Sequence, residues 1–211
     1  MCRLLAVRSK EDFEIAEHLE KLALISKNSK EYQGHGWGCS YLDKADEWKH
    51  YKNIKPIWED DFTEFPKTKL LVAHARSAFQ DKGIKIENNM PFYDNKYVFV
   101  FNGELRGVRI KEEGRIGAEK IFNFIKRFDE GNIKKALEKG ASIIKNNSGY
   151  IRGMNIIIAD KKHIFLYTFF SQEPDYYTMH YKEGKELVAC SESYPDEKGW
   201  HSIANDTLEV W

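Results

Sequence analysis

The first seven residues, MCRLLAV (residues 1–7), carry the feature that bears most on fold and chemistry, a cysteine directly behind Met1. Removal of Met1 would leave a chain whose first residue holds a thiol and a free amine. An α-amino group titrates near pH 8 and a thiol near about 8.5, so Cys2 would combine a nucleophile with a candidate base. The alternative is that Cys2 is a small buried side chain on a first strand, which the apolar run behind it predicts.

Length, composition and charge limit the classes of protein to which the chain could belong. With 211 residues, of which 42% are hydrophobic, the chain is expected to form a single domain over residues 1–211. Its 33 basic and 33 acidic residues balance, which gives no case for binding nucleic acid or an anionic membrane. No signal-like segment opens the chain and the longest apolar run is too short to span a bilayer, so we expect a cytoplasmic protein.

The cysteines and histidines follow no metal-binding pattern. Three cysteines are widely spaced without a CxxC pair, so neither a zinc site nor a disulfide framework is expected. The sequence contains no HExxH motif and no glycine-rich nucleotide-binding loop. It therefore predicts no metal and no cofactor.

Short runs rich in β-branched and aromatic residues predict strands, and three segments have helical periodicity instead. The expected strands are Cys2–Arg8, Trp37–Leu42, Leu70–Ala75, Tyr97–Phe101, Asn155–Ala159, Ile164–Phe170, Tyr176–Tyr181 and Leu187–Ser191. The expected helices lie around residues 15–22, 121–128 and 132–146. Hairpin-length turns between several strands favour antiparallel pairing. We expect an α+β fold of two mostly antiparallel sheets with helices packed outside.

Polar residues follow two of the expected strands and are candidates for a site. Arg76, at the end of one strand, could bind a carboxylate through two parallel hydrogen bonds. Asn102 and Gly103, after another, offer a side-chain amide and an unobstructed backbone N–H, the two donors that an oxyanion hole needs. Trp37 lies between two glycines, which would let the backbone approach a ligand while the ring forms a wall. A surface ion pair, a type I′ turn and a core tryptophan are the respective alternatives.

Six short motifs occur in the order typical of one enzyme family. They are MCRLLAV (1–7), GHGWGCSYL (34–42), HARSA (74–78), NNMPF (88–92), FVFNGEL (99–105) and ACSES (189–193). Taken together, they resemble a class II (N-terminal nucleophile) glutamine amidotransferase, and most closely a stand-alone branch related to γ-glutamyl hydrolases. The resemblance covers nearly the whole chain and implies a four-layer αββα sandwich of the Ntn-hydrolase type.

The resemblance also implies roles for individual residues. Cys2 would be the nucleophile after loss of Met1, and its own amine would relay protons. Asn102 and the Gly103 N–H would stabilise the oxyanion. Arg76 would hold the substrate carboxylate, with Ser77 beside it, and Trp37 would shape the pocket.

Four positions depart from the family pattern. Phe101 and Met90 stand where the family usually has histidine, and Phe79 stands at a position where it commonly has threonine. These changes predict a more apolar pocket and a bulkier or less polar substrate. Gly117 replaces the aspartate that normally binds the substrate α-ammonium, and Glu119 or Glu192 is the candidate to substitute for it. Free glutamine is then expected to bind weakly, or the substrate to lack an ammonium group there.

The function expected from these residues is cleavage of the side-chain amide of glutamine or of a γ-glutamyl compound through a Cys2 thioester. The alternatives are a catalytically impaired relative that serves as a small-molecule sensor or subunit, and a structural β-rich interaction domain. The expected partner is a small-molecule substrate. The sequence leaves open a separate ammonia-accepting synthase and a homo-oligomer.

Overall fold

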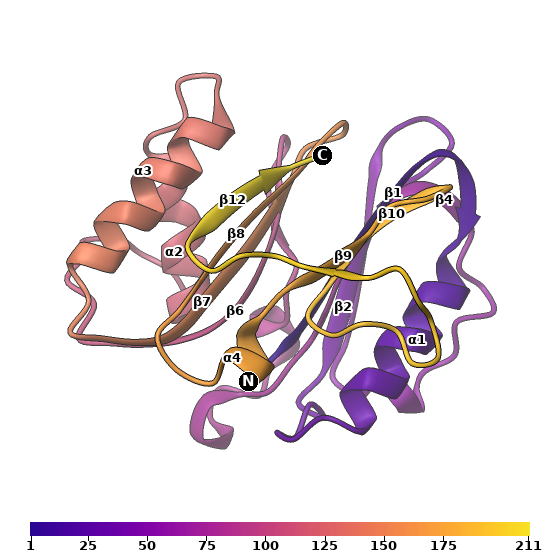
Figure 1. Cartoon of the computed structure of the whole chain (residues 1–211), viewed down its shortest axis with the longest axis horizontal. Coiled ribbons are helices and arrows are strands. Elements are labelled where there is room, and N and C mark those ends of the chain that lie inside the picture. Colours follow the sequence, from indigo (N-terminus) through magenta and orange to yellow (C-terminus); the bar gives the residue numbers. More distant parts are fainter.

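A computed structural model describes all residues, 1–211, and arranges them in four layers in the order helix, sheet, sheet, helix (Figure 1). Every strand pairing in both sheets is antiparallel. The expected α+β class and the αββα sandwich are therefore confirmed.

The first sheet has seven strands, with the N-terminal strand at its centre. Their spatial order is β11 (His201–Ser202), β9 (His180–Lys182), β10 (Glu186–Cys190), β1 (Arg3–Glu14), β4 (Lys67–Ala75), β2 (Trp37–Leu42) and β3 (Trp48–Asn53). β1 pairs with β4 on one side and with β10 on the other, with Leu5 opposite Ala73 and Cys190. A strand from the start of the chain thus pairs with one from its last quarter in the middle of this sheet.

The second sheet has five strands. Their order is β12 (Thr207–Val210), β8 (Ile164–Phe170), β7 (Tyr150–Ala159), β6 (Val98–Arg106) and β5 (Phe92–Tyr93). β6 and β7 pair over most of their length, and their register shifts between Glu104 and Leu105. This irregularity bends the strand end that carries Asn102 and Gly103.

Helices cover the outer face of each sheet (Figure 1). The helices are α1 (Ile15–Lys27), α2 (Gly117–Lys126), α3 (Ile133–Asn146) and α4 (Pro174–Tyr177), with single turns η1 (Ile57–Glu59), η2 (Phe79–Asp81) and η3 (Ile86–Asn88). The first three correspond to the three predicted helical segments. The Asn132 side chain caps α3 by accepting a 3.1 Å hydrogen bond from the Lys135 N–H. None of the helices combines the length and apolarity needed to cross a bilayer.

The strand predicted over Tyr176–Tyr181 is wrong in its first half. Pro174 opens the short helix α4, because proline is preorganised for the first helical position, and only His180–Lys182 join the sheet. Four strands were not predicted, namely β3, β5, β11 and β12. All four lie at sheet edges, where partial exposure removes the apolar alternation on which strand prediction depends.

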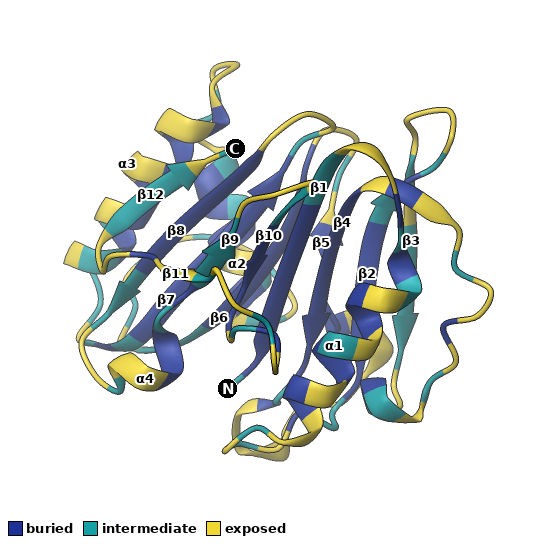
Figure 2. Ribbon diagram, turned by 45° about the vertical axis from the view of Figure 1, so that its right-hand side comes forward, coloured by how far each residue is buried: buried dark blue, intermediate teal, exposed yellow.

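The core consists of two apolar layers, visible as the buried strand surfaces in Figure 2. Successive side chains of β1 point alternately into one apolar layer and into the other. Leu4 and Ala6 pack between the two sheets, while Leu5 and Val7 pack against α1. Cys2 continues the series of Leu4 and Ala6, so its side chain points between the sheets, toward β6.

Candidate active site

One pocket of about 620 Å³ contains the Cys2 side chain. The residues around it come from the start of β1, the end of β4, the end of β6 and the start of α2. Cys2, Arg76, Ser77 and Gly103, which the sequence analysis singled out, all line it. The two sheets therefore bring together residues that are up to about 100 positions apart in the sequence.

Cys2 lies at the bottom of this pocket and is 9% exposed. The backbone N–H of Ser77 donates to Sγ at 3.4 Å, and the thiol donates to the carbonyl oxygen of Ser77 at 3.6 Å. Burial raises the pKa of the Cys2 thiol, although the nearby terminal amine, the Ser77 N–H and Arg76 act in the opposite direction. The thiol is thus protonated at neutral pH, and its reactivity requires a base beside it.

Met1 lies against the same pocket with its polar atoms held by three side chains. Its amine forms an ion pair with Glu31. Its carbonyl oxygen accepts hydrogen bonds from the side chains of Gln33 and Tyr176. Burial raises the pKa of the Glu31 carboxyl, but the Met1 amine and Arg152 outweigh it, so the net pKa is below the ordinary value. Glu31 is therefore an anion placed to hold an ammonium group at the start of the chain.

Arg152 on β7 joins three carboxylates at the rim of the pocket. Its guanidinium donates to Glu173 at 2.6 Å, to Glu31 at 3.0 Å and to Glu104 at 3.3 Å. Glu104 is 9% exposed and also accepts a 2.7 Å hydrogen bond from Arg106. These ion pairs connect the second sheet with the segment that holds Met1.

Replacing Arg152 by leucine is expected to lower the free energy of unfolding by about 2 kcal/mol, because the buried carboxylate of Glu104 and its neighbours lose their shared cation. Arg106→Leu is the matched control. The Arg106 side chain is 65% exposed and pairs with a single carboxylate, that of Glu104, besides lying over the Tyr150 ring, so its loss should cost less than about 1 kcal/mol. Urea unfolding of both variants measures the difference. Equal losses would contradict a special role of Arg152 in joining the sheets.

Asn102 is fully buried, yet neither atom of its side-chain amide has a hydrogen-bond partner. In its cross-strand neighbour Asn155, by contrast, both atoms of the side-chain amide have hydrogen-bond partners. Asn155 donates to the Tyr177 carbonyl oxygen at 2.7 Å and accepts from Thr168 at 2.7 Å. A buried amide without partners costs free energy, about 1–3 kcal/mol. Asn102 itself does not line the pocket, whereas its neighbours Phe101 and Gly103 do.

Gly103 follows Asn102 and lines the pocket. A Cβ at this position would collide with the carbonyl oxygen of Gly153 and with the ring of Phe101. Packing thus requires glycine at this position. Without a side chain, the backbone of β6 itself lines the pocket here. Phe101, which precedes Asn102, contributes its ring to the pocket wall together with Met90 and Phe79.

Arg76 and Ser77 leave the end of β4 beside Cys2. The guanidinium of Arg76 is buried and donates to Asn89 Oδ1 at 3.2 Å and to the Gly83 carbonyl oxygen at 2.9 Å. Burial lowers the pKa of the Arg76 guanidinium, against the effect of the Cys2 thiolate. Arg76 thereby anchors the loop between β4 and β5 while one edge of its guanidinium lines the pocket.

The structure places Trp37 outside the pocket, so its expected role as a pocket wall is wrong. The ring lies on the α1 side of the first sheet, where it is fully buried and packs edge to face on Phe62. Its Nε1 donates to Asp60 at 2.8 Å. The glycine after Trp37 lets the segment around Met90 pack closely on β2, since a Cβ on Gly38 would come within 2.7 Å of the Met90 carbonyl oxygen.

Glu119 also lies outside the pocket lining. Its carboxylate accepts hydrogen bonds from the backbone N–H of Arg115 at 2.6 Å and from Arg115 Nε at 2.9 Å. These contacts close a turn at the start of α2 and leave Glu119 unsuited to replace an aspartate at position 117. The expectation for Glu119 is therefore corrected.

Three functional candidates were missed by sequence reasoning: Glu31, Glu104 and Arg152. Glu104 lies in the FVFNGEL motif, directly after the oxyanion candidates, and this position in the motif was the available sequence signal. The structure shows that Glu104 is buried. Glu31 and Arg152 lie in segments without a motif and meet only through the packing of the two sheets. No three His, Cys, Asp or Glu side chains gather in a metal-binding arrangement.

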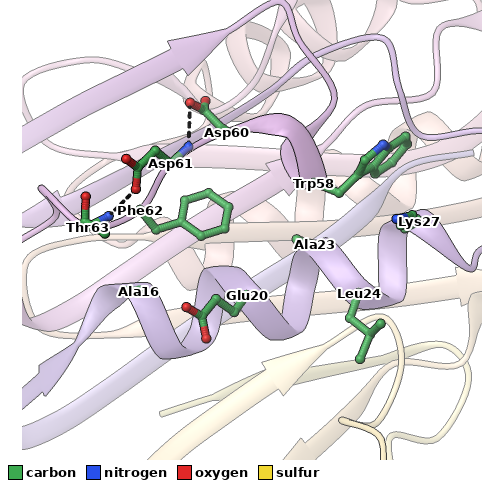
Figure 3. A pocket seen from close by; sticks show the side chains of 10 residues that line it. All are labelled: Ala16, Glu20, Ala23, Leu24, Lys27, Trp58, Asp60, Asp61, Phe62 and Thr63. Carbon is green, nitrogen blue, oxygen red and sulfur yellow. Dashed lines mark hydrogen bonds between the residues drawn. The ribbon is translucent and has the colours of Figure 1, made fainter.

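A second hollow, of about 420 Å³, lies between α1 and the segment around η1 (Figure 3). Its walls include Glu20, Lys27, Trp58 and Asp61, and no cysteine lines it. Asp60 at its edge already accepts hydrogen bonds from Trp37, Tyr51 and Asn53. The Cys2 pocket is therefore the candidate active site.

The layered fold is that of class II glutamine amidotransferase domains, which solved structures share with this chain. Glutamine phosphoribosylpyrophosphate amidotransferase from B. subtilis superposes with a TM-score of 0.63 at 16% identity, over 90% of this chain and 42% of that one. A glutamine aminotransferase class-II domain protein from Silicibacter pomeroyi gives 0.63 at 13% identity, over 99% and 94%. A predicted glutamine amidotransferase from Pseudomonas aeruginosa PA01 gives 0.61 at 15% identity, over 100% and 97%.

The likeness lies in three-dimensional structure. No protein-family model and no curated protein matches the chain in sequence. The chain spans less than half of the B. subtilis enzyme but nearly all of the other two proteins.

Proposed function

We propose that the protein is an amidohydrolase that cleaves a carboxamide, of the glutamine or γ-glutamyl type, through a thioester on Cys2. The observation that carries this proposal is the buried Asn102 amide, which has no partner in the protein and lies on β6 between Phe101 and Gly103, two residues that line the Cys2 pocket. A developing oxyanion would supply that partner. The three unpaired cysteines suit a cytoplasmic location, where thiols stay reduced.

The mechanism begins with removal of Met1, which converts the backbone nitrogen of Cys2 into a free amine. In its neutral form this amine takes the proton of the buried thiol, and the thiolate attacks the amide carbon. The carbonyl electrons move to oxygen, where Asn102 Nδ2 and the Gly103 N–H donate to the negative charge. The ammonium then returns its proton to the leaving nitrogen, and the C–N bond breaks to give ammonia or an amine.

Hydrolysis of the thioester repeats the same steps with water as the nucleophile. The neutral amine of Cys2 accepts a proton from water, the hydroxide adds to the thioester carbon, and the oxyanion forms again beside Asn102. Collapse expels the Cys2 thiolate, which recovers its proton, and the carboxylic acid leaves. The freed ammonia either diffuses away or passes to a separate synthase.

Processing of Met1 decides whether the protein is active. We expect ammonia release to scale with the fraction of chains that lack Met1, because the retained residue keeps the Cys2 nitrogen in a peptide bond and its own amine on Glu31. Intact mass gives that fraction, and treatment of unprocessed protein with a methionine aminopeptidase varies it. Equal turnover by processed and unprocessed preparations would rule out the Cys2 amine as the base.

A further inference from the structure

The lining of the Cys2 pocket combines a cluster of charged side chains with a set of aliphatic ones. Glu31, Glu104 and Arg152 lie at the end where the chain begins. Beyond Gly103, the segment that leads into α2 and the first turn of α2 add aliphatic side chains, with Arg106 and Lys120 among them. The aliphatic lining consists of Leu105, Val108, Ile110, Ile116, Ala118 and Ile121.

The two ends receive different halves of the substrate, an argument that rests on the proposed function. The Cys2 amine must reach the leaving nitrogen to protonate it, and Glu31 is the anion positioned for an ammonium at the start of the chain. The leaving group thus lies toward Glu31. Because the acyl half is attached on the other side of the attacked carbon, it extends past Gly103 toward α2 and the aliphatic lining.

The charges in the pocket disfavour an ammonium on the acyl half. Five cationic side chains line the pocket: Arg76, Lys82, Arg106, Lys120 and Arg152. Only two carboxylates do so, Glu31 and Glu104, and both are bound to Arg152. A carboxylate on the acyl half would find a favourable field, whereas an ammonium would meet an excess of positive charge and no free carboxylate.

Gly117 adds free space at that end. It lines the pocket at the first position of α2, and a Cβ built there has no atom within 4 Å. Gly117 is exposed, so the space beside it is open to solvent and available to a substituent of the substrate.

We propose that the substrate is an amide whose acyl half carries an apolar substituent in place of a free ammonium, as in a glutamine whose α-nitrogen is acylated. The apolar substituent lies on Val108, Ile116 and Ile121, in the space left by Gly117. Each methylene that this surface removes from water should tighten binding by about fourfold.

Calorimetric titration of the Cys2→Ala variant, with loss of Met1 verified by mass, measures binding apart from catalysis. The probes are L-glutamine, N-acetyl-L-glutamine and N-hexanoyl-L-glutamine. We expect the hexanoyl compound to bind at least about tenfold tighter than the acetyl compound, and glutamine to bind weakest. Equal or tighter binding of glutamine, or no binding of any of the three, would overturn the inference.

A substitution at Gly117 provides the converse test in the same background. Gly117→Asp places a carboxylate in open space, and we expect glutamine to bind about fivefold tighter. Gly117→Asn, of the same shape without the charge, should leave glutamine unchanged. Ammonia release by the wild-type protein is the separate readout: hexanoyl-selective binding without any turnover would refute the proposed function and leave the inference about the ligand standing.

Discussion

The Cys2→Ala variant is expected to release ammonia from amide substrates at least about 1,000-fold more slowly than the wild-type protein. The variant loses the nucleophile on which both halves of the reaction depend, while its fold should persist. Cys2 precedes β1 and contributes only a weak pair of contacts with Ser77. Steady-state ammonia release and thermal unfolding, measured on the same preparation, separate the two effects.

Two other cysteines of the chain provide matched controls. Cys39 and Cys190 are fully buried and unpaired, and both pack in the layer beneath α1. Burial raises the pKa of the Cys190 thiol to about 11, so it is inert at neutral pH. Alanine at either position should retain turnover within about twofold, given a folded protein. Comparable losses in all three variants, or equal background with and without Cys2, would favour a small-molecule-binding protein without catalysis.

The Asn102→Leu variant is expected to lose activity while gaining or retaining stability. Removal of one oxyanion donor typically lowers kcat by about 100- to 1,000-fold. Because the buried amide of Asn102 has no partner in the free protein, an apolar side chain of similar size removes a desolvation cost. The measurements are kcat on a common substrate and the melting temperature.

Asn155→Leu, at the facing position on β7, should give the reverse pattern. This substitution breaks two hydrogen bonds and leaves the Tyr177 carbonyl oxygen and the Thr168 hydroxyl unsatisfied in the core. The expected loss is about 1–3 kcal/mol of stability, with a smaller effect on kcat. A lower melting temperature for Asn102→Leu than for Asn155→Leu would show that Asn102 is structural.

The fold could be predicted from the sequence wherever burial leaves a periodic signal. The strands over Trp37–Leu42 and Ile164–Phe170 were predicted to the residue, and the three long helices were found from their apolar faces. The edge strand β3 has no fully buried residue, so its sequence carries no apolar alternation and it was not predicted. At Tyr176–Tyr181, aromatic residues suggested a strand, but Pro174 initiates a helical turn that local composition does not reveal.

The candidate site could be predicted in part. Motif order brought out Cys2, Arg76 and Gly103, which the structure places around one pocket. Trp37 was misassigned because alternation along β2 turns its ring toward α1, and a glycine pattern does not tell one face of a strand from the other. Arg152 could not be found, since its role comes from contacts with carboxylates that are at least 21 residues away in the chain.

The central position of β1 has a consequence for the order of events on the ribosome. One neighbour of this strand, β10, ends at Cys190, so the sheet cannot close until the last tenth of the protein has been synthesised. Until then Met1 is free on the nascent chain and accessible to an aminopeptidase. Once Gln33 and Tyr176 donate to its carbonyl oxygen and its amine pairs with Glu31, the Met1 side chain is only 10% exposed. If the proposed function holds, removal of Met1 competes with folding, and slower elongation should raise the fraction of chains that lack Met1.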